Sequence, residues 1–149
     1  MATENKDQEP ETASVTLADG MHFVGNIDGF RIDLDAEESV GGVGAGPQAH
    51  RLLLLALAGC TAMDVISILR KKRQQVSGLS VEVQGSRADQ HPKVYTRIEV
   101  LYRVRGQNVD PRAVVRAIEL SVTRYCPVMA MLGKVAGVTT NYEIEEESW

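Results

Sequence analysis

Residues 52–69 read LLLLALAGCTAMDVISIL and carry a single charge, that of Asp64. A stretch this apolar predicts a helix that is buried on nearly all sides. The basic residues 70–73 follow it, where their charge suits the negative end of a helix dipole. The sequence therefore predicts a long central helix from about Pro47 to about Gln75.

The same length and basic flank also fit a transmembrane helix. Against this alternative, Gly59, Cys60 and Thr61 are small or polar, and a charge such as Asp64 near the centre would cost about 2.5–3.5 kcal/mol on insertion scales. We therefore expect a buried helix in a soluble protein. Because a chain of 149 residues has little material to cover such a helix, we expect a homodimer in which a second subunit helps to bury it.

The composition is that of an ordinary globular protein, with 44% hydrophobic and 24% charged residues. The length predicts one domain, which we place at 14–149, after a disordered tail over 1–13. The net charge of −4 gives no reason to expect nucleic acid as a partner. The first residues are polar and lack the apolar core of a secretory signal, so we expect a cytoplasmic location and no membrane partner.

Alternating apolar residues predict strands on both sides of the central helix. The expected strand regions are 15–34, 79–83, 94–104 and 138–144, the second and third pairing as a hairpin. Asp110-Pro111 and Cys126-Pro127 each place proline at a first helical position, which predicts two further helices. The inner stripe of the first comprises Val114, Ala117, Ile118 and Ser121, and the second runs from Pro127 to about Leu132. This order of elements is that of an α+β chain.

The chain has two cysteines, Cys60 inside the long helix and Cys126 at a predicted helix start. Two cysteines are too few for a disulfide framework, and in a reducing cytoplasm a disulfide is more often catalytic than structural. Unpaired N–H groups and the helix dipole at a helix start favour a thiolate at Cys126. Each cysteine has an alternative interpretation as a small, inert core residue. The pair is therefore a candidate redox couple.

Several segments resemble the OsmC/Ohr family of osmotically induced and organic-hydroperoxide-resistance proteins. Gly46-Pro47 together with residues 52–74 is similar to the family's central helix, and residues 116–121 with 125–132 are similar to its second cysteine motif. Residues 92–98 also resemble the strand between them. The likeness covers roughly residues 40–144 and is greatest for the OsmC-like branch.

The resemblance implies an α+β OsmC-like fold: an intertwined homodimer whose long central helix packs against antiparallel sheets, with two active sites at the subunit interface. It implies that Cys60 is the peroxidatic cysteine, which attacks an organic hydroperoxide and becomes a sulfenic acid. Cys126 would be the resolving cysteine, which then forms a disulfide with it. A dithiol reductant, often a lipoylated protein, would reopen the disulfide. No metal, haem or flavin cofactor is implied.

One part of the family pattern differs in this chain. The family's peroxidases hold the thiolate with an arginine and a glutamate, and the glutamate belongs nine or ten residues before the first cysteine. Here Arg51 and His50 occupy those positions. The family arginine comes from the N-terminal strands, where Arg31 is the only arginine before Arg51. Because a thiolate needs a positive neighbour at neutral pH, Arg31 and Arg51 are the candidates for that role.

Three alternatives complete the interpretation. A metal site of His50, Cys60 and Cys126 is not demanded by the spacing, since ten helical residues separate the first two by about 15 Å of rise. Asp64, one turn after Cys60, is expected to be a packed and paired carboxylate at the subunit interface. Finally, the missing glutamate favours a second hypothesis, a catalytically inactive dimer that binds a small apolar ligand. An enzyme should have one fast-reacting cysteine, whereas the binder should have two slow ones.

Overall fold

The structure is a computed structural model that describes residues 9–147. The chain divides into two compact units, Met1–Leu52 and Leu53–Trp149. Most of the predicted tail, residues 1–8, lies outside the described residues, and the first strand begins at Ala13. A single domain over 14–149 stays a prediction.

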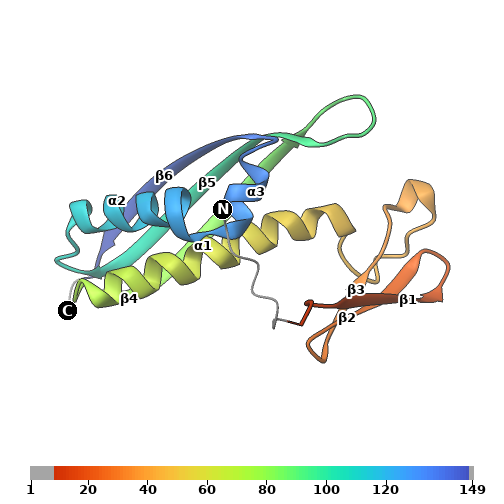
Figure 1. Ribbon diagram of the computed structural model, residues 1–149, viewed down its shortest axis with the longest axis horizontal. Helices are drawn as coiled ribbons and strands as arrows, with labels where there is room; N and C mark the ends of the chain where they lie inside the picture. The colour runs from red at the N-terminus through yellow and green to blue at the C-terminus, as the bar shows by residue number, and fades with distance from the viewer. Residues whose placement is uncertain (1–8, 148–149) are drawn as a thin grey trace. The chain divides into compact units, whose positions relative to one another are not determined.

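The first unit is built around a three-stranded antiparallel sheet in the order β1-β2-β3 (Figure 1). Its strands are β1 (Ala13–Asp19), β2 (His22–Ile27) and β3 (Phe30–Leu34). Asp28 and Gly29 both have positive φ, 52° and 82°, which is the backbone of a two-residue hairpin turn. Gly20, which also has a positive φ of 54°, follows β1 and leads into β2. Two short 3₁₀ turns follow, Glu38–Val40 and Ala49–Arg51.

The second unit contains a long helix, a second three-stranded sheet and the C-terminal helices (Figure 1). Its elements are α1 (Leu52–Lys71), β4 (Gln75–Arg87), β5 (Tyr95–Gln107), α2 (Pro111–Leu120), a π-helical turn (Ser121–Tyr125), α3 (Pro127–Leu132) and β6 (Gly137–Glu146). The expected hairpin is confirmed, because β4 and β5 pair antiparallel. The expectation of purely antiparallel sheets is wrong, because β6 pairs parallel to β5. The helical crossover between them returns the chain to the end from which β5 starts.

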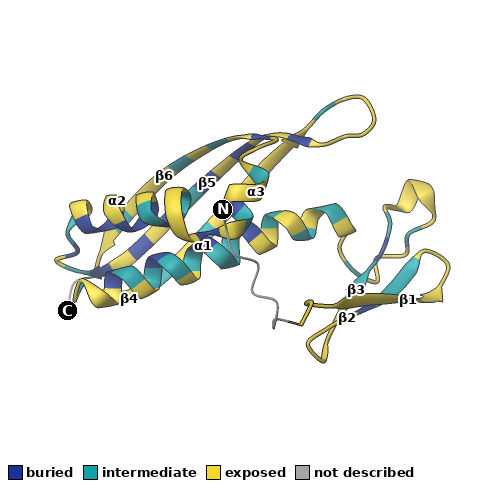
Figure 2. Ribbon diagram, in the orientation of Figure 1, coloured by how far each residue is buried: buried dark blue, intermediate teal, exposed yellow. Residues whose placement is uncertain are grey.

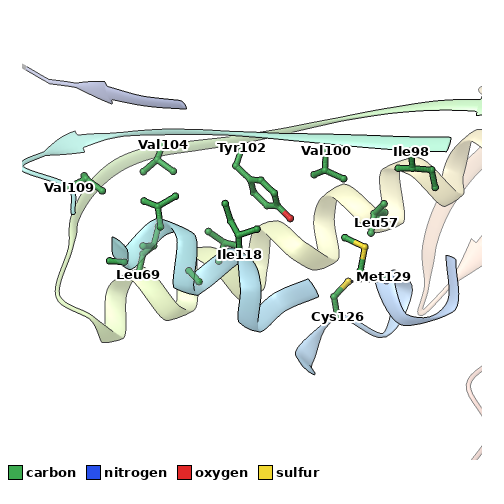
Figure 3. Packing of buried hydrophobic residues seen from close by; sticks show 14 of the residues in the cluster. Leu57, Leu69, Ile98, Val100, Tyr102, Val104, Val109, Ile118, Cys126 and Met129 are labelled. Atoms are coloured by element: carbon green, nitrogen blue, oxygen red, sulfur yellow. Dashed lines mark hydrogen bonds between the residues drawn. The ribbon is translucent and has the colours of Figure 1, made fainter. Parts of the chain in front are cut away.

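The core of the second unit lies between β5 and the helices. Along β5, alternate residues point inward and are buried, as the dark bands in Figure 2 show; they are Ile98, Val100, Tyr102 and Val104. The predicted inner stripe of α2 is confirmed, since Val114, Ala117, Ile118 and the adjoining Ser121 are buried. Figure 3 shows Tyr102 directing its hydroxyl group from β5 toward α1. This layer of helices on one sheet face positions the residues discussed below.

Within one chain, α1 is buried along one stripe. The predicted burial on nearly all sides, which includes the cover of a second subunit, stays a prediction. The buried residues are Leu57, Thr61, Val65 and Leu69, four apart and therefore on one helix face. Leu55 and Met63 are 68% and 72% exposed. The segment Ala49–Lys71 is also long and apolar enough to cross a membrane by length and composition. Three residues of its buried stripe, Leu57, Val65 and Leu69, belong to the hydrophobic core of the unit.

Both proline-marked helix starts are confirmed. The Asp110 side chain accepts a hydrogen bond from the backbone N–H of Arg112, and Pro111 is the first residue of α2. At α3, the Cys126 sulfur occupies the equivalent position and accepts from the N–H of Met129 at 3.3 Å. A cysteine in a capping position is held in place by the helix it begins.

Candidate active site

The structure brings the two cysteines together, although 66 positions separate Cys60 from Cys126 in the numbering. Their sulfur atoms and a carboxylate oxygen of Asp64 all lie within 4.8 Å of one another. Cys60 is partly exposed, whereas Cys126 is only 3% exposed. Both are free thiols. The site therefore pairs an accessible thiol on α1 with a buried one at the start of α3.

The π-helical turn before α3 aims Cys126 at this site. The N–H of Cys126 donates to the carbonyl oxygen of Ser121 at 2.9 Å, a hydrogen bond that spans five residues. The widened turn lets Ser121 and Cys126 face α1 together. The Ser121 hydroxyl accordingly donates a hydrogen bond to Asp64 Oδ2 on α1, at 2.8 Å. Such turns are frequent at functional sites. No local pattern in the sequence predicted this turn.

The Cys126 thiol is buried, and this decides its protonation. Burial raises its pKa from the ordinary value to about 11; the neighbouring Cys60 adds to the rise, and the N–H of Met129 opposes it. The expectation that a helix start would stabilise a thiolate at this position is therefore wrong. The desolvation of a buried sulfur outweighs the backbone N–H groups of Met129 and Val128 at the start of a helix of only six residues.

Alkylation of Cys126 tests this protonation state. In a Cys60→Ser variant, the labelling rate of Cys126 with iodoacetamide should rise roughly tenfold per pH unit between pH 7 and 9, because only the thiolate reacts. Burial remains in the variant, so the pKa stays above its ordinary value although Cys60 no longer contributes. Intact-mass spectrometry of timed samples measures the rate, with a short cysteine peptide as control. A rate that levels off below pH 9 would contradict the assignment.

Asp64 ends a buried chain of hydroxyl groups. Thr61 Oγ1 lies 2.7 Å from Tyr102 Oη and 2.8 Å from Ser121 Oγ. Because a hydroxyl has one hydrogen and Ser121 donates its own to Asp64, Thr61 must donate to Ser121 and Tyr102 to Thr61. Burial raises the pKa of Tyr102, which keeps its hydroxyl protonated. Three donors therefore point one after another toward a carboxylate beside two thiols.

The predicted arginines lie in the first unit, whereas the thiols lie in the second. Arg31, on β3, donates from Nε and Nη2 to Asp33 at 3.1 and 2.9 Å. Hydrogen bonds from Arg31 and then His22 lower the pKa of Asp33 to about 2. Arg51 ends the second 3₁₀ turn and is exposed. A role for either arginine beside the thiolate stays a prediction.

Cys60, Asp64 and Cys126 are also the group of described residues with the geometry to hold a metal ion. Two thiolates and a carboxylate are ligands that Zn²⁺ accepts. This set differs from the one weighed from the sequence, in which His50 took the place of Asp64. The expectation of no metal stays a prediction.

The profile of the OsmC-like protein family matches residues 42–141 of the sequence. The chain belongs to the OsmC-like family. Protein YhfA of Escherichia coli is 34% identical over 133 residues, which cover 89% of this chain and 96% of YhfA. A protein of Aquifex aeolicus solved as a hypothetical protein is 28% identical, with a TM-score of 0.84 over 95% of this chain and 100% of the other.

A more distant solved structure is described as the organic hydroperoxide resistance protein OsmC of Legionella pneumophila. It has a TM-score of 0.67 at 14% identity over 93% of this chain and 99% of the other, which shows a shared fold. The resemblance to the OsmC/Ohr family and the α+β OsmC-like fold inferred from the sequence are thus confirmed.

In this OsmC-like protein, the sequence motifs identified both thiols but not Asp64 as a member of the site. A signal was available, because Asp64 follows Cys60 by four residues and therefore lies on the same helix face one turn later. Ser121, Thr61 and Tyr102 had no comparable signal. Their hydroxyl groups meet only when three different elements pack together.

Proposed function

We propose that this OsmC-like protein is a thiol-dependent peroxidase that reduces organic hydroperoxides through Cys60 and Cys126. One observation carries the proposal: a partly exposed thiol and a buried thiol, distant in sequence, lie within 4.8 Å. Such a pair suits a cycle in which one sulfur meets the peroxide and the other resolves the product. The fold shared with an organic hydroperoxide resistance protein supports the substrate class.

In this cycle the Cys60 thiolate attacks the terminal oxygen of the hydroperoxide. The O–O bond breaks, the alcohol leaves with a proton, and Cys60 becomes a sulfenic acid. The sulfur of Cys126 then attacks that of Cys60, water leaves, and a disulfide forms. A dithiol reductant, in the manner of a lipoylated protein, reduces the disulfide and restores both thiols. A cytoplasmic location and a role in oxidative stress defence go with this chemistry.

Intact-mass analysis after one equivalent of cumene hydroperoxide tests the function. The wild type should lose two hydrogen atoms as the disulfide forms, and Cys126→Ser should gain one oxygen that a sulfenic-acid probe traps. No mass change in either protein within minutes would contradict the proposal. The second hypothesis, an inactive dimer that binds a small apolar ligand, would then take its place.

A homodimer is the second part of the proposal. Met63 and Leu55 are exposed on α1, and a methyl group added at Gly59 would meet no atom within 4 Å. This leaves an open apolar helix face that a second subunit can cover. It also fits the family resemblance, which implies two active sites at a subunit interface.

A charge on this face should weaken the dimer. Because an unpaired lysine is costly to bury, Met63→Lys should raise the dimer dissociation constant on the order of tenfold or more. Sedimentation across a range of protein concentrations measures the constant. Val135→Lys, which places the same charge on an exposed residue outside α1, is the matched control. A wild type that sediments as a monomer at all concentrations would refute the dimer.

A further inference from the structure

Asp64 has no role in the cycle described above, yet its carboxylate lies beside both reacting sulfurs. We propose that Asp64 transfers the proton in the disulfide-forming step, taking it from the Cys126 thiol and giving it to the hydroxyl that leaves Cys60. The inference rests on the proposed peroxidase function and assigns a residue to its second step.

The second step needs a base because Cys126 must lose its proton to attack. Its side chain is 3% exposed, which keeps bulk water from the sulfur. Burial raises the pKa of this thiol above its ordinary value, so little of it is ionised near neutral pH. A base that accepts the proton during the attack removes the need for this rare species.

The geometry supplies that base. Asp64 follows Cys60 by one helical turn on α1, and a carboxylate oxygen lies within 4.8 Å of both sulfurs, so one group is near both the start and the end of the proton's path. Ser121 holds Oδ2 at 2.8 Å and fixes the orientation of the carboxylate. Catalytic hydrogen bonds in free enzymes are often long and shorten only in the reacting complex, so this separation is compatible with proton transfer.

The hydroxyl chain behind Asp64 keeps the proton in the site. Tyr102, Thr61 and Ser121 each donate a hydrogen bond to the next group in the chain, which ends at the carboxylate. Their hydroxyl hydrogens are therefore all engaged in hydrogen bonds. Carrying a proton away along this chain would require Tyr102 to accept a second proton, which a phenol does not do near neutral pH. A proton taken up by Asp64 therefore has one productive destination, the sulfenic oxygen on Cys60.

The step balances without a further reagent. An S–S bond forms between Cys126 and Cys60 as the S–O bond of the sulfenic acid breaks, and the electron pair of that bond leaves with oxygen. The proton of Cys126 passes through Asp64 to this oxygen, which departs as water. The carboxylate is regenerated, and Cys60 is reduced from sulfenic acid to disulfide while Cys126 is oxidised.

Asp64→Asn tests the inference, because the amide keeps the size of the side chain but is not a base. After one equivalent of cumene hydroperoxide, samples quenched with a sulfenic-acid probe and measured by intact mass give both steps separately. Sulfenic acid should form at a rate within about threefold of wild type, whereas disulfide formation should slow by about 10²–10⁴-fold. Glu99→Gln, a change at an exposed carboxylate paired with Arg97, should leave both steps unchanged.

The pH profile separates proton transfer from mere support of the structure. Wild-type disulfide formation should vary little between pH 6 and 8, whereas in Asp64→Asn it should rise roughly tenfold per pH unit, because only pre-formed Cys126 thiolate can react. If Asp64→Asn does not fold, Ser121→Ala, which releases Oδ2, should slow disulfide formation with the rate of the first step preserved.

The outcomes distinguish the two proposals. Disulfide formation in Asp64→Asn at the wild-type rate and with the wild-type pH profile would overturn the role of Asp64 and leave the peroxidase intact. Absence of sulfenic acid in the wild type would overturn the peroxidase itself, and with it this step.

Discussion

Replacement of Cys60 by serine is expected to abolish peroxide turnover, with kcat/KM for cumene hydroperoxide falling roughly 10³-fold or more. The reason is chemical, because a serine hydroxyl at neutral pH is not a nucleophile toward a peroxide oxygen. Cys60 is also the more accessible of the two thiols, since Cys126 is buried. Peroxide consumption coupled to a dithiol reductant measures the loss.

Cys126→Ser is the matched comparison. This variant keeps the attacking thiol, so it should consume about one equivalent of peroxide per chain and then stop with a sulfenic acid on Cys60. Steady turnover by Cys60→Ser, or equal behaviour of the two variants, would contradict the assigned order of the sulfurs. A far-ultraviolet circular dichroism spectrum of each variant shows whether the fold is intact.

Leu57→Ala is expected to have the largest effect on stability, a loss of about 2–5 kcal/mol in the free energy of unfolding. Leu57 has no exposed surface and lies in the core beneath β5, where Figure 3 shows it close to Met129. Truncation removes buried apolar surface and leaves a cavity that the sheet and α1 cannot fill. Urea unfolding at fixed protein concentration measures the difference.

The control for this variant is Val135→Ala. Val135 is 64% exposed in the turn before β6, so the same kind of truncation should change the free energy of unfolding by no more than about 0.5 kcal/mol. A loss below about 1 kcal/mol for Leu57→Ala would mean that the core around the site repacks with ease. Retained peroxide activity in a destabilised Leu57→Ala protein would separate stability from chemistry.

Local signals predicted much of the fold. The Asp-Pro and Cys-Pro pairs gave the starts of α2 and α3, because proline geometry acts within one turn of the chain. Strict alternation gave β5 and its buried face. The parallel pairing of β6 with β5 could not be predicted from alternation. Alternation indicates that a segment is a strand, but it does not show in which direction the neighbouring strand runs.

The site was predicted only in part for a similar reason. The motifs named Cys60 and Cys126, but their approach depends on the packing of α3 against α1. The position of Cys126 at a helix start predicted a stabilised thiolate, but burial raises the pKa of this thiol instead. Burial arises only when the chain folds, so the local sequence does not reveal it. Asp64 was interpreted as a paired interface carboxylate; its partner is Ser121 of the same chain, and it faces the thiols.

The π-helical turn at Ser121–Tyr125 has a consequence for how this part of the chain tolerates change. In an ordinary α-helix each residue advances the direction by about 100°, so residues five apart point to different sides. Here the wider turn aligns Ser121 with Cys126, and the number of residues between them sets the alignment. Substitutions along the turn leave that number unchanged, whereas deleting one residue would swing the second sulfur away from the first. Chain length across five positions is therefore under tighter constraint than the identity of the residues that fill them.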